Sequence, residues 1–299
     1  MRRPLISVAL AALILLIWPA TALAAASDPL LATSGNYAVL ASATITSAGA
    51  SWITGQMALS PGTSITGFPP GTSGHQDIND GAALQARNDA IAAYNKAAGE
   101  PGCTSTGGVE LGSRTLTPGL YCNGTMGISA GLTLTLSGGG IYIFQVGTTL
   151  ITGASSRVLL TNGAQPCDVF WQVGSSATIG ASTTFVGTIL ANVSITMVTA
   201  ATLNGRALAS LGSSAPSQGS VTLDTNRIIQ PGGCSGGFTT NFAPPAFVPP
   251  PAGTLLPATL GVPWELVNEV PWLLLIAVGA GIGATMMVVS NRRRRRRSA

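Results

Sequence analysis

The fold is indicated by residues 168–209, whose sequence is DVFWQVGSSATIGASTTFVGTILANVSITMVTAATLNGRALA. Short runs of β-forming residues, such as VFWQV and TTFVGTIL, alternate with Gly, Ser, Ala and Asn. The runs are too short for a β-sandwich, and the connections are too short for crossover helices. A chain that turns roughly every five to eight residues, with small residues at the corners, can wind as a β-solenoid.

The same order of strand, small-residue corner and strand recurs elsewhere in the chain. It is found in GTTLITGASSRVLL (147–160), GSSATIGASTTFVG (174–187) and NVSITMVTAATLNG (192–205). Near the N-terminus, ATITSAGASWITGQMALS (43–60) matches SITMVTAATLNGRALAS (194–210). The spacing is irregular, roughly 17 to 28 residues per coil, so the repeat is not strict. A pairing of the N-terminal strands with late ones would close the solenoid out of sequence order.

One helix is predicted, over residues 79–98. Asp77, Asn79 and Asp80 are candidate caps for its start, and Gly99 followed by Pro101 ends it. Its apolar stripe consists mostly of alanine: Ala82, Ala83, Ala86, Ala90, Ile91, Ala93, Tyr94 and Ala97. Because alanine allows close approach to a flat β surface, we expect the helix to lie along the solenoid.

Few side chains are suited to chemistry. Charged residues make up only 8% of the 299, and His75 is the only histidine. No P-loop or metalloprotease motif is present. The remaining candidates for paired carboxylates are scattered: Asp77, Asp80, Asp168 and Asp224. We therefore expect no enzyme, and no zinc site, because neither a Cys-x-x-Cys pair nor histidine spacing is present.

The formal net charge of +4 arises from the two ends of the chain. Eight of the arginines are Arg2, Arg3 and residues 292–297. The span from Ser27 to Val262 holds six basic and eight acidic residues, a balance of −2. The predicted domain therefore has no basic footprint, and we expect no nucleic-acid partner.

Both ends of the chain carry targeting signals. Residues 1–26 have the basic start, apolar middle and Ala-x-Ala end of a secretory signal peptide; an uncleaved N-terminal anchor is the alternative. Residues 271–289 are 19 residues without charge, enough for a transmembrane helix. The arginine-rich tail at 290–299 predicts that this end stays in the cytoplasm and that the domain faces outward.

A spacer separates the domain, residues 27–230, from this span. Residues 231–263 hold eight prolines and no charge, as in an extended stalk, and residues 264–270 are juxtamembrane. Within the stalk, LPATL (256–260) resembles the L-P-x-T-G sorting signal of sortase substrates, with leucine in place of glycine. Cell-wall attachment is therefore a second model for the anchor.

Four cysteines in an oxidising compartment predict two disulfides. Three pairings are possible. A bond between Cys103 and Cys122 would close the loop after the helix, and a bond between Cys167 and Cys234 would tie the last coils to the stalk. We predict both of these bonds, Cys103–Cys122 and Cys167–Cys234.

Alternation along the strands predicts which residues point outward. If Ile195 and Met197 face inward, then Ser194 and Thr196 face outward, and the same reasoning applies to the other coils. The predicted outward array is Thr44, Thr46, Thr149, Ile151, Ser176, Thr178, Ser194, Thr196 and Thr222. Stacked coils would bring these residues into a flat array that is nearly free of charge. Threonine is also simply a good strand former, so the pattern alone does not assign a function.

The chain resembles the secreted ice-binding protein family. The resemblance covers residues 34–230 and rests on GNYAVLASATIT (35–46), ITGQMALSPGTSITGF (53–68), AAYNKAA (92–98), GIYIFQVGTTL (140–150), CDVFWQVGSSATIGASTTFVGTILANVSIT (167–196), NGRALA (204–209) and VTLDTN (221–226). It implies a discontinuous right-handed β-helix flanked by one long helix. It also implies adsorption to ice through a flat face, with no cofactor and no reaction.

The resulting hypothesis is an ice-binding protein of the antifreeze type whose partners are the ice surface and, through its C-terminal helix, the membrane. Gly127 and Ile151 interrupt the array of hydroxyls. The alternative is a cell-surface adhesin or matrix protein that binds glycans or other cells and lacks ice activity.

Overall fold

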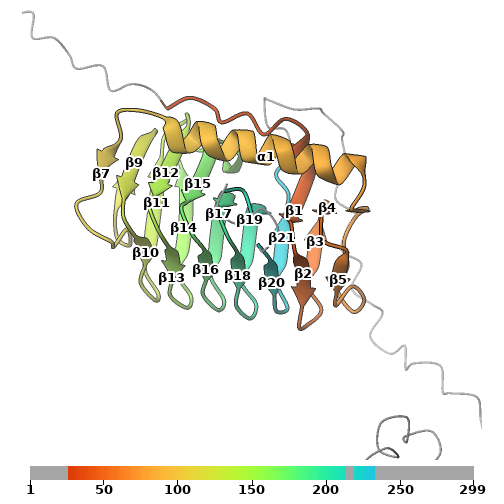
Figure 1. Cartoon of the computed structure of the whole chain (residues 1–299). Coiled ribbons are helices and arrows are strands. Elements are labelled where there is room, and N and C mark those ends of the chain that lie inside the picture. The colour runs from red at the N-terminus through yellow and green to blue at the C-terminus, as the bar shows by residue number, and fades with distance from the viewer. Residues whose placement is uncertain (1–25, 213–218, 233–299) are drawn as a thin grey trace, which may run out of the picture. The chain divides into compact units, whose positions relative to one another are not determined.

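The computed structural model describes residues 26–212 and 219–232, which form a stack of β-coils with one long helix along its side (Figure 1). Neighbouring strands pair in parallel, and they divide into a 14-stranded sheet and a seven-stranded sheet. Because each coil turns three times, the stack has three faces, which we name A, B and C. The prediction of a mainly β, parallel solenoid with one helix is confirmed.

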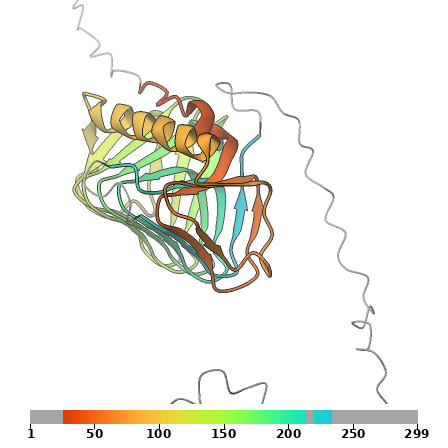
Figure 2. The same ribbon diagram turned by 45° about the vertical axis from the view of Figure 1, so that its right-hand side comes forward.

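Face A is one part of the larger sheet and lies under the helix. Its strands are β6 (Gln76–Ile78), β4 (Gln56–Leu59), β1 (Tyr37–Ala41), the second halves of β19 (Thr202–Leu208) and β17 (Thr184–Ala191), β15 (Val169–Val173), β12 (Tyr142–Val146), β9 (Gly119–Asn123) and β7 (Thr104–Ser105). Figure 2, turned by 45°, shows the helix against this side.

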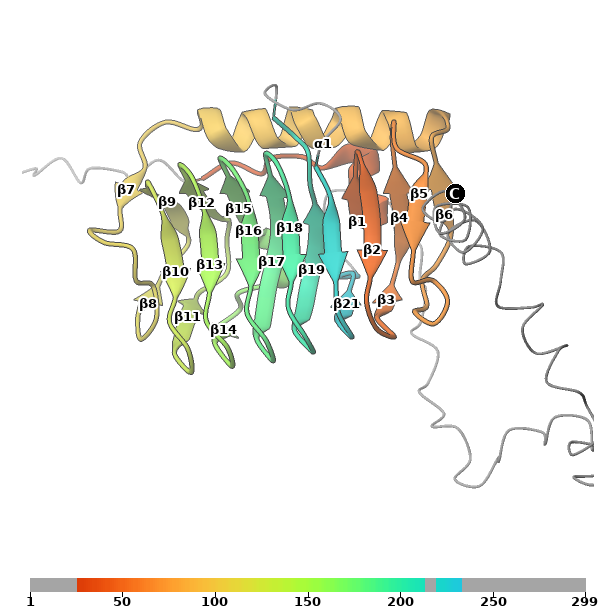
Figure 3. The same cartoon turned by 60° about the horizontal axis from the view of Figure 1, so that its bottom comes forward.

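Face B is the seven-stranded sheet, whose strands lie side by side in Figure 3. In stacking order they are β10 (Met126–Ile128), β13 (Leu150–Thr152), β16 (Ala177–Ile179), β18 (Ile195–Met197), β20 (Val221–Leu223), β2 (Thr44–Ser47) and β5 (Ser64–Thr66).

Face C is the other part of the larger sheet. Its strands are β8 (Thr115–Leu116), β11 (Thr133–Ser137), β14 (Arg157–Thr161), the first halves of β17 and β19, β21 (Arg227–Ile229) and β3 (Trp52–Thr54). Strands β17 and β19 continue around the corner into face A through the paired residues Gly187 and Gly205. A Cβ on Gly205 would lie 1.9 Å from the carbonyl oxygen of Gly187, so only glycine fits there.

The coils are stacked out of sequence order. The N-terminal strands β1, β2 and β3 pair with the late strands β19, β20 and β21. Coil length varies without disturbing the stack, from 18 residues between the paired positions Ala177 and Ile195 to 27 between Leu150 and Ala177. Surplus residues are placed in the turns.

Helix α1 (Gly81–Gly99) carries the chain back from the β6 end of the stack toward the β7 end. Its 19 residues span about 28 Å, or about six strand spacings of 4.8 Å. It starts two residues later than predicted. Asp80 is the N-cap, and its carboxylate accepts from the backbone N–H of Ala83 at 2.8 Å. Asp77 and Asn79 were therefore wrong as caps.

The alanine stripe does pack on face A. Ala83, Ala86, Ala90, Ala93, Tyr94 and Ala97 are buried against outward side chains of face A such as Leu40 and Phe170. Ala82 is exposed, so its place in the predicted stripe was wrong. The 3₁₀ turn η1 (Ala32–Asn36) also contacts the helix, and the N–H of Thr33 donates to Asp89 at 3.0 Å.

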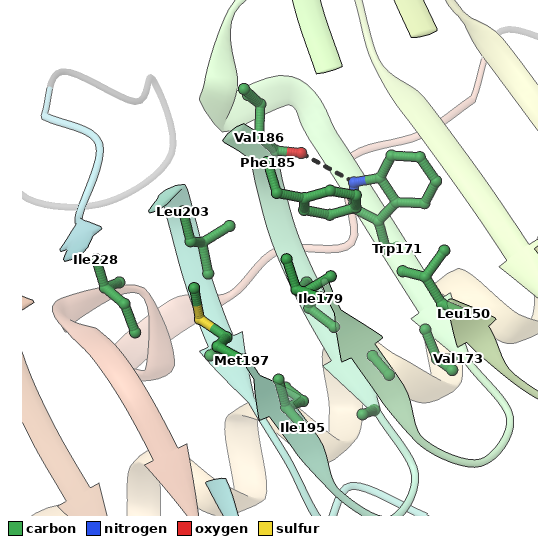
Figure 4. Close-up of a cluster of buried hydrophobic side chains, with 14 of the residues drawn as sticks. Leu150, Trp171, Val173, Ile179, Phe185, Val186, Ile195, Met197, Leu203 and Ile228 are labelled. Carbon is green, nitrogen blue, oxygen red and sulfur yellow. Dashed lines mark hydrogen bonds between the residues drawn. The ribbon is translucent and has the colours of Figure 1, made fainter. Parts of the chain in front are cut away.

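Inside the coils, side chains stack in ladders that follow the strand register. Phe144 lies 3.9 Å from its register partner Trp171 between ring centroids, and Trp171 also lies 4.9 Å from Phe185, which pairs in register with Leu203. The indole N–H of Trp171 donates to the carbonyl of Val186 at 3.0 Å (Figure 4), which satisfies a polar group in an otherwise apolar interior. A second 3₁₀ turn, η2 (Pro166–Asp168), precedes β15.

The predictions for both ends of the chain fall outside the described residues. These are the signal peptide at 1–26 apart from Ala26, nearly all of the stalk at 231–263, the juxtamembrane segment at 264–270, the transmembrane helix at 271–289 and the tail at 290–299. Within residues 26–212 and 219–232, no helix is long and apolar enough to span a membrane.

Substitution of Ala90 by leucine should lower the free energy of unfolding by about 1–3 kcal/mol, because extra volume cannot fit between α1 and face A. Ala92 is exposed on the same helix, so Ala92→Leu should change it by less than about 0.5 kcal/mol. Urea unfolding followed by circular dichroism measures both values. Equal losses in the two variants would contradict the close packing of the helix.

Candidate functional site

Face B presents two parallel rows of side chains to solvent. The first, which we name the threonine row, is set by direct strand register across five strands. Its members are Thr178, Thr196, Thr222, Thr46 and Thr66. The second, the serine row, lies two residues earlier in each coil, at or just before the start of the strand. Its members are Thr125, Thr149, Ser176, Ser194, Ser220, Thr44 and Ser64.

All nine residues predicted from alternation lie on this one face. Thr46, Thr178, Thr196 and Thr222 belong to the threonine row, and Ile151 continues that row by pairing with Thr178. The other four, Thr44, Thr149, Ser176 and Ser194, belong to the serine row. The alternating partners Ile195 and Met197 point inward and are buried, as predicted.

Four hydroxyl residues of the face were missed. Ser64 and Thr66 lie on the edge strand β5, where they pair with Thr44 and Thr46. Ser220 and Thr125 precede β20 and β10 and extend the serine row. The signal for β5 was the alternation in Thr63-Ser64-Ile65-Thr66, which is the same pattern that identified β2.

The threonine row is interrupted at the β10 end of the face. Ile151 is 52% exposed, and its neighbour in register is Gly127. A Cβ at Gly127 would lie 2.7 Å from the carbonyl oxygen of Ile151, so no larger residue fits that position. The unbroken hydroxyl array therefore runs from β16 to β5, about 19 Å at the usual strand spacing.

The two rows differ in what their hydroxyls bind. The Oγ of Ser176 accepts from the N–H of Ser194 at 3.3 Å, and the Oγ of Ser194 accepts from the N–H of Ser220 at 3.2 Å. The hydroxyls of the threonine row have no hydrogen-bond partner among the described residues. Ser176 and Ser194 thus reinforce the stacking of the coils, while the threonine row leaves its hydroxyls to water.

Face B also lacks charge. None of its seven strands, all of which are described, contains an acidic or basic residue. Apart from Ile151, its outer side chains are short, so the surface from β16 to β5 is flat and offers hydroxyl and methyl groups. Such a surface interacts with water without orienting it around an ion.

The candidate carboxylates do not converge on one catalytic site. Asp77 accepts from the hydroxyl of Tyr37 at 2.6 Å and lies 3.0 Å from Nε2 of His75. Burial, followed by the hydrogen bond to Asp77, raises the pKa of Tyr37 far above its usual range. Asp80 caps the helix, and Asp224 accepts from the hydroxyl of Thr225 at the turn before β21.

No group of His, Cys, Asp and Glu side chains within the described parts of the chain could hold a metal ion. The predicted disulfide between Cys103 and Cys122 is present and ties the segment after the helix to β9. Cys167 is also disulfide-bonded. Its predicted partner, Cys234, lies outside the described residues, so that pairing stays a prediction.

The model of the family described as "Ice-binding-like" matches residues 39–229, which include every strand of the solenoid from Val39 onward. The chain belongs to the ice-binding-like family. The matched span includes face B, with both of its rows, as well as the helix that carries the chain back.

Named relatives lead to the same family. An ice-binding protein of Nostoc sp. is 42% identical over 210 residues, which cover 68% of this chain and 75% of that protein. An ice-binding protein of Flavobacterium frigoris is 35% identical and covers 67% of this chain and 76% of its own length.

Solved structures agree in fold. An ice-binding protein from an Antarctic biological consortium has a TM-score of 0.64 at 40% identity and covers 69% of this chain and 92% of its own. One from the Antarctic ascomycete Antarctomyces psychrotrophicus has a TM-score of 0.62 at 37% identity and covers 67% of this chain and 97% of its own.

The two rows of face B should respond differently to loss of a hydroxyl. Ser194→Ala should lower the free energy of unfolding by about 1 kcal/mol, because it leaves the N–H of Ser220 without its side-chain acceptor. Thr196→Val keeps the β-branched shape and should change it by less than about 0.5 kcal/mol. Urea unfolding of both variants tests this, and a larger loss in Thr196→Val would contradict the assignment of roles.

Proposed function

We propose that this protein adsorbs to ice through face B, as an ice-binding protein of the antifreeze type. The observation that supports the proposal most directly is the threonine row, in which five hydroxyls stand in strand register without a protein partner. Membership of the ice-binding-like family and the similarity to named ice-binding proteins support it independently.

The proposed mechanism depends on geometry and not on a reaction. Each hydroxyl of the threonine row holds a water molecule, and the adjacent methyl groups restrict how that water can turn. Parallel strands place these waters about 4.8 Å apart in one direction, and alternate residues place the next row roughly 7 Å away. A sheet of water held in this order can merge with a crystal, and adsorbed protein then blocks growth.

Flatness and absence of charge matter for the same reason. A charged side chain would impose its own hydration shell and displace the ordered sheet. A side chain that projects above the face would hold the crystal away from the remaining hydroxyls. The activity needs neither cofactor nor catalytic residue, so we propose that the protein is not an enzyme. As a separate point on the fold, we propose that the coils of the solenoid wind right-handedly.

The location of the activity is a separate proposal. The apolar span at 271–289 and the arginine-rich tail at 290–299 favour a protein held at the cell envelope, with its solenoid outside and its C-terminus in the cytoplasm. The signal-like segment at 1–26 favours export. An ice binder that is tethered in this way would hold or shape ice at the cell surface, unlike a dissolved antifreeze.

Substitution of Thr196 by tyrosine should abolish thermal hysteresis and ice shaping, because the ring would project from within the threonine row, and Thr178→Tyr should do the same where the row meets Ile151. Thr184→Tyr is the matched control: Thr184 is exposed on a strand of face C, so the same change should leave ice activity intact. Thermal hysteresis and recrystallisation inhibition are measured on the purified proteins, with circular dichroism to verify folding.

Thr66, on the edge strand β5, allows the effect of a substitution at the end of the threonine row to be compared with one inside it. Thr66→Tyr should weaken hysteresis less than Thr196→Tyr, because Thr66 ends the row on β5 while Thr196 lies within it. The adhesin alternative predicts no ice activity in the unmodified protein, together with binding to cells or polysaccharide that survives all of these substitutions. Absence of hysteresis, ice shaping and recrystallisation inhibition in the unmodified protein would reject the ice proposal.

A further inference from the structure

Face C carries a second ordered row of outward residues with different chemistry. Direct strand pairing aligns one residue from each of six consecutive strands. The row consists of Thr133, Arg157, Thr184, Thr202, Arg227 and Trp52. Like the threonine row of face B, it is straight and flat, but it contains two cations and a large aromatic ring.

The two arginines are the only charged residues in the strands of face C, all of which are described. They lie three strand steps apart, about 14 Å at the usual spacing. The span between Ser27 and Val262 is net acidic, with six basic and eight acidic residues. The strands of face C carry positive charge only, so the charge of this face is opposite in sign to that of the span as a whole. Such a face creates a local field that attracts anions.

Both guanidinium groups are available to a ligand. Arg227 lies over the ring of Trp52 at 4.5 Å from its centroid, which restricts the side chain without using its N–H donors. The side chain of Arg157 is exposed and has no hydrogen-bond or ion-pair partner within residues 26–212 and 219–232. The carboxylate of Asp224, at the turn before β21, already accepts from the hydroxyl of Thr225.

We propose that face C binds an acidic polysaccharide whose carboxylates pair with Arg157 and Arg227. The planar guanidinium forms two parallel hydrogen bonds with a carboxylate, so each arginine specifies an anionic sugar. The hydroxyls of Thr184 and Thr202, which lie between the arginines, can hydrogen-bond the hydroxyls of the intervening sugars. A flat row across parallel strands suits an extended chain laid over it.

The sparseness of charge favours a polysaccharide over other anionic polymers. Double-stranded DNA carries about one charge per 1.7 Å of its axis, and proteins that bind it neutralise many phosphates at once. Attachment to an anionic membrane gains only about 1 kcal/mol per basic residue, so two residues give weak binding. Two cations separated by neutral hydroxyls fit a polymer in which anionic groups are spaced by neutral polar ones.

The test measures binding of the purified full chain to a polyuronate, alginate, with neutral dextran, single-stranded DNA and phosphatidylserine vesicles as comparisons. We expect binding to alginate at low ionic strength and none to dextran. Arg157→Gln and Arg227→Gln should each weaken alginate binding by about tenfold or more, since each removes a charge-assisted hydrogen-bond pair. Circular dichroism establishes that the variants are folded.

Two control variants separate this site from general charge and from the ice face. Lys96→Gln removes one positive charge from the exposed side of α1 and should leave alginate binding within about twofold. Thr178→Tyr should abolish ice activity and leave alginate binding intact, while the two arginine variants should keep ice activity. Failure of the ice proposal therefore leaves this one standing, and the reverse also holds.

Three results would overturn the proposal. The first is absence of alginate binding by the unmodified protein at low salt. The second is an equal loss in Lys96→Gln, which would mean that net charge and not face C attracts the polymer. The third is tighter binding of DNA or of vesicles than of alginate through the same two arginines, which would assign face C to that partner instead.

Discussion

The structure depends above all on the in-register hydrogen bonding between parallel strands of successive coils. Once Ala177 pairs with Ile195 and Thr178 with Thr196, the position of every residue on those strands is set relative to the coil below. The inward residues then form ladders, as Phe144 and Trp171 do, and the outward residues form straight rows. The register requires only that the strands of successive coils align, and the turns between strands can differ in length. Coils of 18 and 27 residues can therefore stack in one array.

A second consequence is that the two ends of the solenoid sequence meet on one face. Thr46 and Thr222 are neighbours in the threonine row although most of the domain separates them in sequence. This contact exists because α1 returns the chain along face A, which frees the N-terminal coil to stack on the last one. The continuity of face B therefore depends on the packing of an alanine stripe on the opposite side of the stack.

Much of this architecture could be predicted from the sequence, because alternation of apolar and hydroxyl residues is a local signal. Alternation predicted that nine residues, including Thr178 and Ile151, point outward, and all nine lie on face B. Ser64 and Thr66 were missed although Ser64-Ile65-Thr66 has the same alternation as Thr44-Ile45-Thr46, because β5 lies between turn-forming residues and does not belong to the repeated coil pattern. The cap was ambiguous because Asp77 and Asp80 both precede the helix, and only the backbone geometry separates them.

Other properties of the site depend on contacts between residues that are far apart in sequence, so they could not be predicted from local sequence patterns. The serines and threonines of face B are similar in sequence, yet Ser194 accepts a hydrogen bond from the next coil and Thr196 does not. That difference arises from where each hydroxyl stands relative to a neighbouring strand. The pairing of Arg227 with Trp52 has the same origin, since the two residues are brought together only by the out-of-order stacking of β21 and β3.

The contrast between faces B and C shows how one backbone supports two surface chemistries. Both faces present threonines at the same strand spacing, so threonine content alone does not distinguish a surface for ordered water from a surface for a polymer. Charge does, because a guanidinium binds its own water and attracts anions, while a hydroxyl beside a methyl leaves the water network neutral. In a solenoid the spacing is supplied by the backbone, and the choice of ligand is left to a few outward side chains.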